Sequence, residues 1–392
     1  MTAQTDPGAA APPRSHDVIV IGGGPVGSAF AIALREAGVR VLLVEARTGP
    51  STDRRSIALS YGSRLVLERL GVWPRLQDAT PIESIHVSQR AGFGRALLHA
   101  GEAGLPALGY VVPYATLHAA LTAGLAHCGA VEVRPGSEVI DLRPDAAGVT
   151  VVCRSEGREW QARAALAVLA DGGSLARAAA AHRERAYSQS AVVAEVRTGR
   201  THGNRAYERF TPAGPMALLP SGDRFALVWT TTPERATELL DLDDAAFLHA
   251  LQAAFGGRAG HFVECSARAA YPLALRVSGT PRQPHVALLG NAAQTLHPVA
   301  GQGLNLGLRD AWQLAQLAAR ERGSIGTTAF LERYRRARQP DRASTIALTD
   351  LLVGTFSNDL GPLRWARGFG LTLLDLLAPA KRAFISRMTF GG

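Results

Sequence analysis

The first fifty residues combine continuous apolar runs with a helical period. Residues 17–21 read DVIVI, which is typical of a parallel strand buried on both faces. A helical pattern over 29–38 ends at Gly38, a residue favoured just after a helix. Residues 39–46 (VRVLLVEA) form a second apolar run. Strand, glycine-rich turn, helix and strand in this order predict a Rossmann-type nucleotide-binding unit.

The pattern changes several times in the rest of the chain. An amphipathic helix is expected over 56–71, and residues 81–112 carry short alternating segments typical of antiparallel strands. A helix is expected over 114–129, and strand-like segments dominate 187–277. A buried strand returns in VALLGNAA (286–293), and helical patterns fill the remainder.

These changes predict an α/β fold: a discontinuous Rossmann-type domain, an inserted antiparallel β-sheet domain that binds substrate, and a helical C-terminal tail. The expected boundaries are a disordered tail over 1–15, a nucleotide-binding domain over 16–80, 113–180 and 278–348, a substrate domain over 81–112 and 181–277, and a helical segment over 349–392.

Charge adds little to this picture. The net charge is +9, but Lys381 is the single lysine, so arginine supplies almost all of the positive charge. The basic residues are scattered and form no dense arm, which argues against a nucleic-acid partner. Cys128, Cys153 and Cys265 are far apart and odd in number, which fits a reducing cytoplasm rather than a disulfide framework or a metal cluster. No apolar run is long enough to span a bilayer.

The glycine-rich turn carries the first chemical signal. Gly22 permits a tight turn, Gly24 lets a pyrophosphate approach the backbone, and Gly27 lets the helix pack closely on the sheet. Glu45 closes the second strand where an acid that binds a ribose is expected. The alternative is an ordinary glycine-rich turn, which would not need the strand, the helix and the acid in these places.

The second signal lies in 286–310, VALLGNAAQTLHPVAGQGLNLGLRD. A buried strand leads to Asn291, and Pro298, Gly301 and Gly303 interrupt the chain before a helix begins. Backbone N–H groups at such a helix start can face a planar ligand and stabilise negative charge on it. An ordinary strand–loop–helix corner is the alternative, and it would not need this density of Gly, Pro, Asn and Gln.

This segment resembles the second FAD motif of the flavin-dependent aromatic hydroxylases of the para-hydroxybenzoate hydroxylase type. The family pattern has an Asp where this chain has Asn291 and a His where it has Gln294. Within the family, the chain is most similar to the ubiquinone-biosynthesis branch, the 2-polyprenyl-6-methoxyphenol hydroxylases in particular. The resemblance spans residues 17–390 and includes the stretches DRRSIALS (53–60), GYVV (109–112), YSQ (187–189), YERFTP (207–212) and GPMALLP (214–220).

The resemblance implies FAD as the cofactor. Gly22, Gly24, Gly27 and Glu45 would hold its ADP half. Arg55 resembles the arginine near the flavin and the pyrophosphate, although it could also be a surface arginine at a helix start. The residues implied around the ribityl chain and the flavin ring are Asn291, Pro298, Gly301, Gly303, Leu304 and Asn305.

Two departures from the family pattern affect these assignments. Asp171 and Gly172 resemble the D-G motif near the pyrophosphate, which has been linked to the nicotinamide donor, but Ser174 follows one residue too soon. This departure affects recognition of the donor more than FAD binding. Tyr114 stands where many relatives place Arg or Gln near the flavin, so that role is not carried over.

The activity implied is that of an FAD-dependent monooxygenase that hydroxylates a polyprenylated phenol with dioxygen through a flavin C4a-hydroperoxide. The electron donor would be external, either NAD(P)H or a redox protein. His297 would act as a proton shuttle or contact the phenol, and the alternative is a loop histidine that hydrogen-bonds the backbone. The GPMALLP strand would line the aromatic pocket, so Leu218→Asp is expected to uncouple oxygen consumption from hydroxylation.

Other functions stay open at this point. A halogenase of this fold usually has W-x-W-x-I-P, whereas no two tryptophans here lie two residues apart. A reductase or a different aromatic hydroxylase stays compatible, as does a non-catalytic flavin-binding subunit of a quinone-synthesis complex. The helical tail joins apolar and basic residues and could lie peripherally on the inner membrane, on the protein's own core or on a partner.

Overall fold

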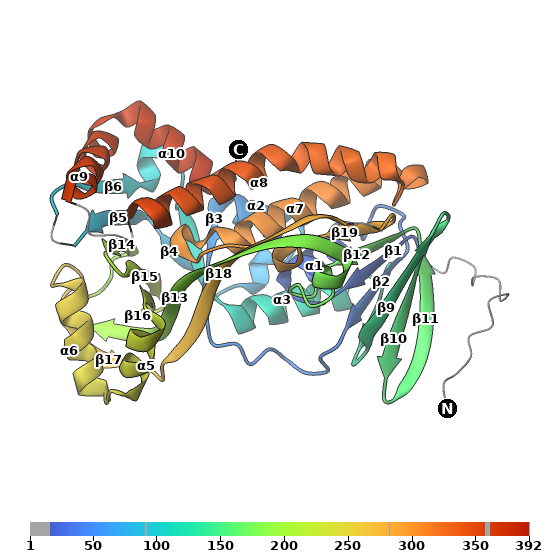
Figure 1. The fold of residues 1–392 in the computed structure, drawn as a ribbon, viewed down its shortest axis with the longest axis horizontal. Coiled ribbons are helices and arrows are strands. Elements are labelled where there is room, and N and C mark those ends of the chain that lie inside the picture. Colours follow the sequence, from blue (N-terminus) through green and yellow to red (C-terminus); the bar gives the residue numbers. More distant parts are fainter. Residues whose placement is uncertain (1–15, 91, 282, 357–360, 392) are drawn as a thin grey trace.

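The computed structural model describes residues 16–90, 92–281, 283–356 and 361–391, and Figure 1 shows their arrangement. The expected tail over 1–15 lies outside the described residues.

The nucleotide-binding domain is built on a parallel sheet. Among the described residues, its five strands have the order β19-β12-β1-β2-β8. Their bounds are Val18–Ile21 (β1), Val41–Glu45 (β2), Val131–Pro135 (β8), Leu166–Leu169 (β12) and Val286–Leu288 (β19). Side chains of β1, β12 and β19 are all buried, as expected where both faces of a parallel sheet are covered. Because β19 comes from a distant part of the chain, the Rossmann-type domain is discontinuous, as predicted.

Helices cover one face of this sheet and a small antiparallel sheet covers the other. The helices are α1 (Pro25–Ala33), α3 (Tyr114–Ala126) and α7 (Gln302–Arg320), all packed in one apolar cluster. The other face packs against β9 (Glu138–Asp145), β10 (Gly148–Ser155) and β11 (Arg158–Ala164). Helix α8 (Thr328–Phe356) lies along α7 and continues through residue 348, where the nucleotide-binding segment was expected to end.

Two helix boundaries differ from the sequence-based expectation. Helix α1 begins at Pro25 and ends at Ala33, and the chain then turns until Gly38. The helix expected over 56–71 begins only at Tyr61, because residues 56–60 form β3 and pair antiparallel with β7 (Gly109–Pro113). The apolar residues of this strand also fit a period of two, and Ser60 caps the following helix α2 (Tyr61–Arg69). A third strand, β4 (Thr80–Ile82), pairs with β7.

The inserted domain is a large, mainly antiparallel sheet. Among the described residues, eight strands follow the order β20-β18-β13-β16-β15-β14-β5-β6, and β17 pairs with β13. Their bounds are Ser84–Gln89 (β5), Arg95–His99 (β6), Ala180–Thr198 (β13), Arg205–Thr211 (β14), Gly214–Ser221 (β15), Arg224–Thr231 (β16), Phe262–Cys265 (β17), Ala269–Pro281 (β18) and Gln294–Thr295 (β20). The long strands β13 and β18 of the large sheet pair with each other and run from beside the nucleotide-binding domain into the inserted domain (Figure 1).

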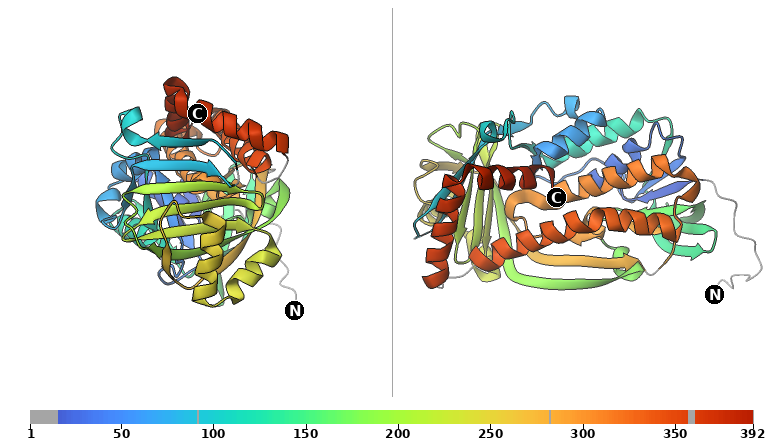
Figure 2. Two further views of the ribbon diagram at one scale, coloured as in Figure 1. Left: turned by 90° about the vertical axis from the view of Figure 1, so that its left-hand side faces the viewer. Right: turned by 90° about the horizontal axis from the view of Figure 1, so that it is seen from above.

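One face of the large sheet is covered by α5 (Pro233–Asp241) and α6 (Asp244–Phe255), with an apolar cluster between them. The opposite face looks toward the nucleotide-binding domain. Helices α9 (Gly361–Leu376) and α10 (Ala378–Phe390) stand at the end of the molecule that holds the large sheet (Figure 2). None of the described helices is both long and apolar enough to cross a membrane.

The remaining short helical segments are η1 (Trp73–Arg75), η2 (Ala100–Ala103), α4 (Ala176–Ala179), η3 (Gly290–Ala292), η4 (Val299–Gly301) and η5 (Arg322–Ser324). The segments η3 and η4 lie in the loop between β19 and α7. The predicted domain boundaries stay a prediction. Within the segment 81–112, which was assigned to the substrate domain, β5 and β6 extend the large sheet, whereas the strands at its two ends, β4 and β7, form a separate small sheet with β3.

Candidate functional site

One continuous cavity of about 2420 Å³ joins the two domains. It is lined by the turn after β1, the loop between β19 and α7, the inner face of the large sheet, and parts of α8, α9 and α10. Pockets for a single drug-sized ligand are typically about 300–1,000 Å³. The space is therefore large enough for a dinucleotide and a second molecule together.

The three glycines of the first motif have different steric surroundings. Gly22 has φ +106°, and a Cβ there would lie 2.5 Å from the carbonyl oxygen of Ala170. A Cβ on Gly27 would lie 2.0 Å from the carbonyl oxygen of Gly22. A Cβ on Gly24 would meet nothing within 4 Å, because this residue faces the cavity at the start of α1. The turn and the close packing thus need Gly22 and Gly27, and Gly24 leaves room for a ligand at a helix N-terminus.

Glu45 lies beside this turn at the end of β2. Its carboxylate accepts the backbone N–H of Gly23 at 2.6 Å and the backbone N–H and Nε of Arg47 at 2.9 and 2.8 Å. Burial alone would raise the pKa of Glu45, but these hydrogen bonds outweigh it and hold the pKa below its usual value. The side chain is therefore an ionised acceptor on the cavity wall.

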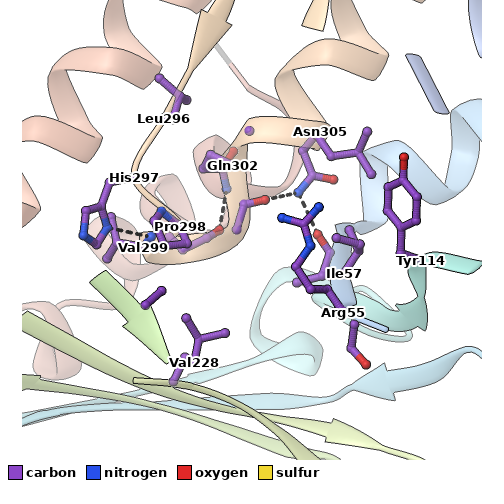
Figure 3. A pocket seen from close by; sticks show the side chains of 18 of the residues that line it. Arg55, Ile57, Tyr114, Val228, Leu296, His297, Pro298, Val299, Gln302 and Asn305 are labelled. Atoms are coloured by element: carbon purple, nitrogen blue, oxygen red, sulfur yellow. Dashed lines mark hydrogen bonds between the residues drawn. The ribbon is translucent and has the colours of Figure 1, made fainter. Parts of the chain in front are cut away.

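Arg55 reaches into the cavity from the segment before β3. Its guanidinium pairs with Asp53, with Nη2 2.6 Å from Oδ2, and lies 5.1 Å from the ring centre of Tyr271. The ring centre of Tyr114 lies 6.0 Å from the same guanidinium. Figure 3 shows Arg55 and Tyr114 beside the loop that leads into α7. Arg55 is thus a cavity residue that contacts an acid and two aromatic rings.

Asp171 and Gly172 follow β12 at the rim of the same cavity. The carboxylate of Asp171 accepts the backbone N–H groups of Gly173 and Leu175 and the hydroxyl of Ser174. Gly172 has φ +83°, and a Cβ there would meet nothing within 4 Å. Asp171 therefore closes a short turn with its own neighbours, while Gly172 leaves the cavity side of that turn open.

The loop before α7 brings the second motif to the cavity. Asn291 and Pro298 line it, and Ala300 and Gly301 both have left-handed backbone angles, with φ of 58° and 60°. Two such residues in succession turn the chain sharply, so α7 begins at Gln302 with its N-terminus on the cavity. A Cβ on Gly303 would meet nothing within 4 Å. The free backbone N–H groups of this helix start favour a negatively charged ligand edge.

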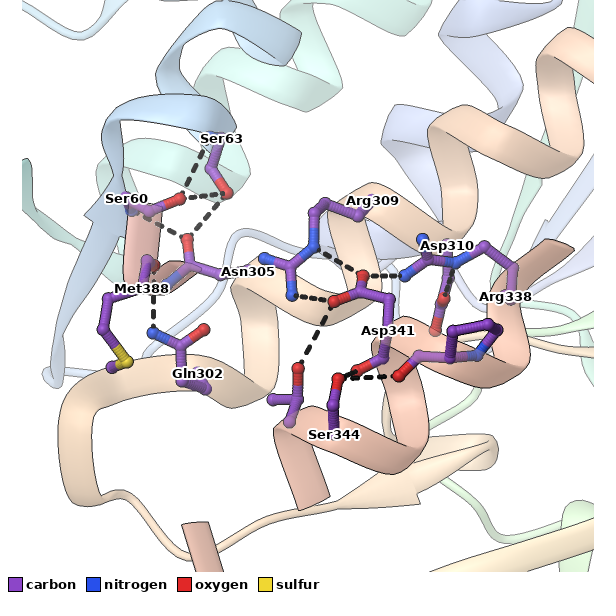
Figure 4. Close-up of polar contacts among 12 residues, drawn as sticks. Ser60, Ser63, Gln302, Asn305, Arg309, Asp310, Arg338, Asp341, Ser344 and Met388 are labelled. Atoms are coloured by element: carbon purple, nitrogen blue, oxygen red, sulfur yellow. Dashed lines mark hydrogen bonds and ion pairs between the residues drawn. The ribbon is translucent and has the colours of Figure 1, made fainter. Parts of the chain in front are cut away.

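Asn305 holds this loop against β3 and α2. Its Nδ2 donates to the carbonyl oxygens of Ala58 and Gly301 at 3.0 and 2.7 Å. Its Oδ1 accepts the backbone N–H of Ser60 at 2.8 Å and the hydroxyl of Ser63 at 2.7 Å (Figure 4). The amide has two N–H donors and two acceptor sites, so all four are used within the protein. Asn305 therefore shapes the loop, and Leu304 beside it lines the cavity.

His297 is 0% exposed at the start of this loop and lines the cavity. Its Nδ1 accepts the backbone N–H of Val299 at 3.1 Å, and this bond places the proton of the neutral ring on Nε2. Burial lowers the pKa of His297 to about 4 despite the opposing effect of Asp350. Among the described residues, Nε2 has no hydrogen-bond partner. The structure thus contains the backbone contact of a loop histidine together with an unused N–H donor.

A buried ionic network supports the other side of α7. Arg338 on α8 donates to Asp310 at 2.6 Å and also pairs with Asp341, which accepts Arg309 Nε at 2.8 Å (Figure 4). Gln294, which replaces the family's His, donates to Asp310 at 2.8 Å. Sequence analysis missed this network, although closely spaced arginines and aspartates in two neighbouring helices were a usable signal.

The large sheet forms the far wall of the cavity. Because side chains alternate along a strand, only one face of β15 can contribute. Ala217 and Leu219 line the cavity, whereas Leu218 is 0% exposed and packs in the cluster under α5 and α6. The GPMALLP strand does line the pocket, but the choice of Leu218 as a pocket residue was wrong by one position.

Glu208 on β14 is a wall residue that sequence analysis did not single out. It lines the cavity, and its Oε1 is buried without a hydrogen-bond partner among the described residues. Burial raises the pKa of Glu208 to about 8. The YERFTP stretch that contains it was visible in the sequence, but nothing there showed which of its side chains faces the cavity.

Comparisons with known proteins find relatives along most of this chain. Residues 15–348 match the family described as FAD binding domain. Ubiquinone hydroxylase UbiL of Rhodospirillum rubrum is 36% identical over 383 residues, which cover 94% of this chain and 88% of that protein. The 3-demethoxyubiquinol 3-hydroxylase of Escherichia coli is 33% identical over 385 residues, covering 93% and 96%.

Solved structures show the same fold. The p-nitrophenol 4-monooxygenase PnpA of Pseudomonas putida superposes with a TM-score of 0.78 at 19% identity, over 96% of this chain and 98% of that one. At this identity the likeness concerns the fold alone.

Proposed function

The chain belongs to the FAD binding domain family and, within it, to the flavin-dependent hydroxylases of ubiquinone biosynthesis, and we propose that it hydroxylates a polyprenylated phenol. The observation that carries this proposal is the single cavity that runs from the glycine-rich turn, past the start of α7, to the apolar wall of the large sheet. A bound cofactor and a lipid-like aromatic ring would meet in it.

The lining residues fit FAD. Gly24 leaves room for a pyrophosphate at the start of α1, and ionised Glu45 would accept the ribose hydroxyls. The start of α7 at Gly301 and Gly303 would face the edge of the flavin ring, which becomes negative on reduction. Asn291 would bind the ribityl or pyrophosphate region through its amide. We further propose that Arg55 stays near the flavin as a cation restrained by Asp53.

Reduced FAD supplies the activation of dioxygen and the transfer of one oxygen atom to the aromatic ring. The chain's own contribution is to hold the ring against the flavin edge and to exclude water. Ala217, Leu219 and Val228 of the sheet provide an apolar surface for this purpose, and Figure 3 shows Val228 opposite the loop that contains Val299. His297 would donate its free Nε2–H within the same space.

Reduction of the flavin needs an external donor, which we propose to be NAD(P)H or a redox protein. Asp171 uses its carboxylate to close its own turn, so this chain's short D-G segment offers a donor little beyond backbone groups. Stopped-flow reduction of the flavin with NADH, NADPH and a reduced ferredoxin would identify the donor. Reduction by none of them, in the presence of a phenol, would contradict this proposal.

We also propose that α9 rests on a membrane surface. Leu371 and Leu374 of α9 line the cavity, yet the opposite side of the same helix is also apolar. Trp365 and Phe369 are 60% and 66% exposed, and the ring of Phe93 packs against both. A surface helix that is apolar on both sides has a second apolar environment to contact. A lipid surface fits, because a polyprenyl chain could pass from it along α9 into the cavity.

Sedimentation with anionic phospholipid vesicles tests the membrane contact. The double variant Trp365→Ser/Phe369→Ser should lose most of the binding. Leu351→Ser is the matched control, because Leu351 is 63% exposed but lies on α8. Wild-type protein that ignores vesicles and instead dimerises through these residues would contradict the proposal.

The proposed activity is tested by loading the protein with FAD and supplying a donor, a prenylated phenol and isotope-labelled dioxygen. Label in the product ring hydroxyl is expected. Gly24→Val should fold but lose FAD, because its side chain would occupy the space of the pyrophosphate. Gly129→Val is the control, since a Cβ there also meets nothing within 4 Å but lies outside the cavity lining. Product formation without labelled oxygen would favour a reductase, and restoration of quinone synthesis by Gly24→Val would favour a non-catalytic subunit.

A further inference from the structure

Glu208 is an acidic side chain set in an otherwise apolar part of the cavity wall. It lies in the middle of β14, where Val87 of β5 and Ala217 of β15 are its register partners on either side. Both partners line the cavity, and so does Phe210, two residues further along β14. The carboxyl therefore faces the space in which the proposed substrate would bind. Its nearest neighbours on the wall are apolar side chains that cannot form hydrogen bonds with it.

No positive charge of its own strand neutralises Glu208. Arg209 points to the other side of the sheet, where its Nη1 lies 3.5 Å from the hydroxyl of Ser88. The charged or titratable groups that the surrounding elements place on the cavity side are Glu195 of β13, His297 before α7 and Arg367 of α9. Within the described residues, none of these forms a hydrogen bond or an ion pair with Glu208. Burial without a partner is the whole cause of its raised pKa of about 8.

The position of Glu208 is tied to the loop at the flavin edge. Val87 and Phe210, which flank Glu208, belong to one apolar cluster with Val299 of that loop. Phe210 also stacks on Phe356 of α8, with ring centres 4.0 Å apart. These contacts fix β14 against the loop, so the carboxyl stays within the region where the ring to be hydroxylated must lie.

We propose that Glu208 is the catalytic base that binds the phenol hydroxyl of the substrate and takes its proton. This inference rests on the proposed function, because it needs a phenol in the cavity. In the step, the phenol O–H bond breaks, a carboxyl O–H bond forms on Glu208, and the negative charge passes from the carboxylate to the phenolate oxygen. The pair carries one negative charge before and after the transfer, so no additional charge is buried.

The chemistry suits hydroxylation of an aromatic ring. A phenolate is richer in electrons at its ring carbons than a phenol and reacts faster with an electrophilic oxygen. An ordinary phenol has a pKa of about 10, and an unperturbed carboxylate would be a weak base toward it. The raised pKa of Glu208 brings the two groups within about two units, which favours transfer once Glu208 is ionised, as the pH approaches 8.

A purely structural role does not account for this residue. An unpaired buried carboxyl destabilises the folded protein when it ionises, whereas glutamine or leucine of similar size would not. Strongly perturbed groups that face a cavity are typical of functional sites.

The experiment compares FAD-loaded wild-type protein with Glu208→Gln and with the control Glu238→Gln, which lies on α5 outside the cavity. The probe is a nitrophenol, whose ionised form is yellow and whose pKa lies below that of Glu208. Above pH 8 the free probe and Glu208 are both ionised, so binding of the yellow anion should take up one proton onto Glu208 in wild type and control, which a pH indicator in weak buffer measures. Glu208→Gln should bind the anion without taking up a proton. Equal proton uptake in Glu208→Gln would overturn the proposal.

Turnover separates this proposal from the function on which it rests. With a phenol that wild type hydroxylates, Glu208→Gln should lower kcat by about 10²–10⁴-fold and lose the rise of kcat with pH, while FAD content is unchanged. Unaltered kcat and pH profile would overturn the role of Glu208 and leave the proposed function intact. A wild type that hydroxylates no phenol would overturn the function, and the proton uptake on binding of the nitrophenol would still decide the role of Glu208.

Discussion

Adjacent leucines on β15 provide a sharp test of the two faces of the large sheet. Leu218 is 0% exposed and packs with Met216, Phe247 and Leu251. Replacing Leu218 by Asp removes a buried side chain, at a cost of about 2–5 kcal/mol, and buries a carboxyl without a partner, at several kcal/mol more. The sum is comparable to the whole free energy of unfolding of a typical folded domain, which is about 5–15 kcal/mol. Leu218→Asp is therefore expected to unfold the protein.

Leu219→Asp should behave differently, because Leu219 is partly exposed on the cavity wall beside Ile82 and Ala206. We expect a loss of about 1–2 kcal/mol, normal FAD content, and oxygen consumption that no longer yields hydroxylated product. Denaturant unfolding, flavin absorbance and the ratio of product to oxygen measure these outcomes. A folded but uncoupled Leu218→Asp together with a fully coupled Leu219→Asp would refute the assigned faces of β15.

Three further variants test other parts of the structure. Arg338→Met should lower the free energy of unfolding by about 3–5 kcal/mol in denaturant titrations, because it leaves Asp310 and Asp341 buried without this cation; a change below 1 kcal/mol would contradict that role. Asn305→Ala should weaken FAD binding at least tenfold by releasing the loop from Ser60 and Ala58, which fluorescence titration measures, and wild-type affinity would argue against loop shaping. The pKa of Glu208 is raised to about 8, so the folded state keeps a proton that the unfolded chain releases near pH 4.5, and wild-type stability should fall between these values. The loss of unfolding free energy between these pH values is at most about 5 kcal/mol, and water in the cavity reduces it. Glu208→Gln should remove this dependence of stability on pH. An unchanged dependence, measured by calorimetry across this pH range, would contradict the assignment.

Much of the cofactor half was predictable because its signals are local. A turn that needs Gly22 and Gly27 is written into six consecutive residues, and its strand and helix follow directly. Glu45 ends β2 as expected, and the glycines before α7 do place a helix start on the cavity. The roles of these residues toward FAD stay predictions.

The expectations that failed concerned short apolar segments, whose pattern fits more than one secondary structure or does not show which face of a strand is buried. Residues 56–60 fit both a strand and a helix, and pairing with β7 decided for the strand. In GPMALLP the sequence determined a strand but not which face of it meets the cavity, so Leu218 was chosen where Leu219 belongs. A shift of one residue exchanges the two faces of a strand, and both faces of β15 are apolar, one against the cavity and one against α5 and α6.

The sequence by itself therefore determined the fold class, the nucleotide-binding turn and the family, because each depends on residues that are close together in the chain. Tertiary structure alone decided which distant residues meet. It left Glu208 unpaired in an apolar wall, used all four hydrogen-bonding sites of Asn305 inside the protein, and joined Asp310 to Arg338. Burial and pairing arise only when separate segments pack, and they set the charge and the hydrogen-bonding capacity that a side chain has left for chemistry.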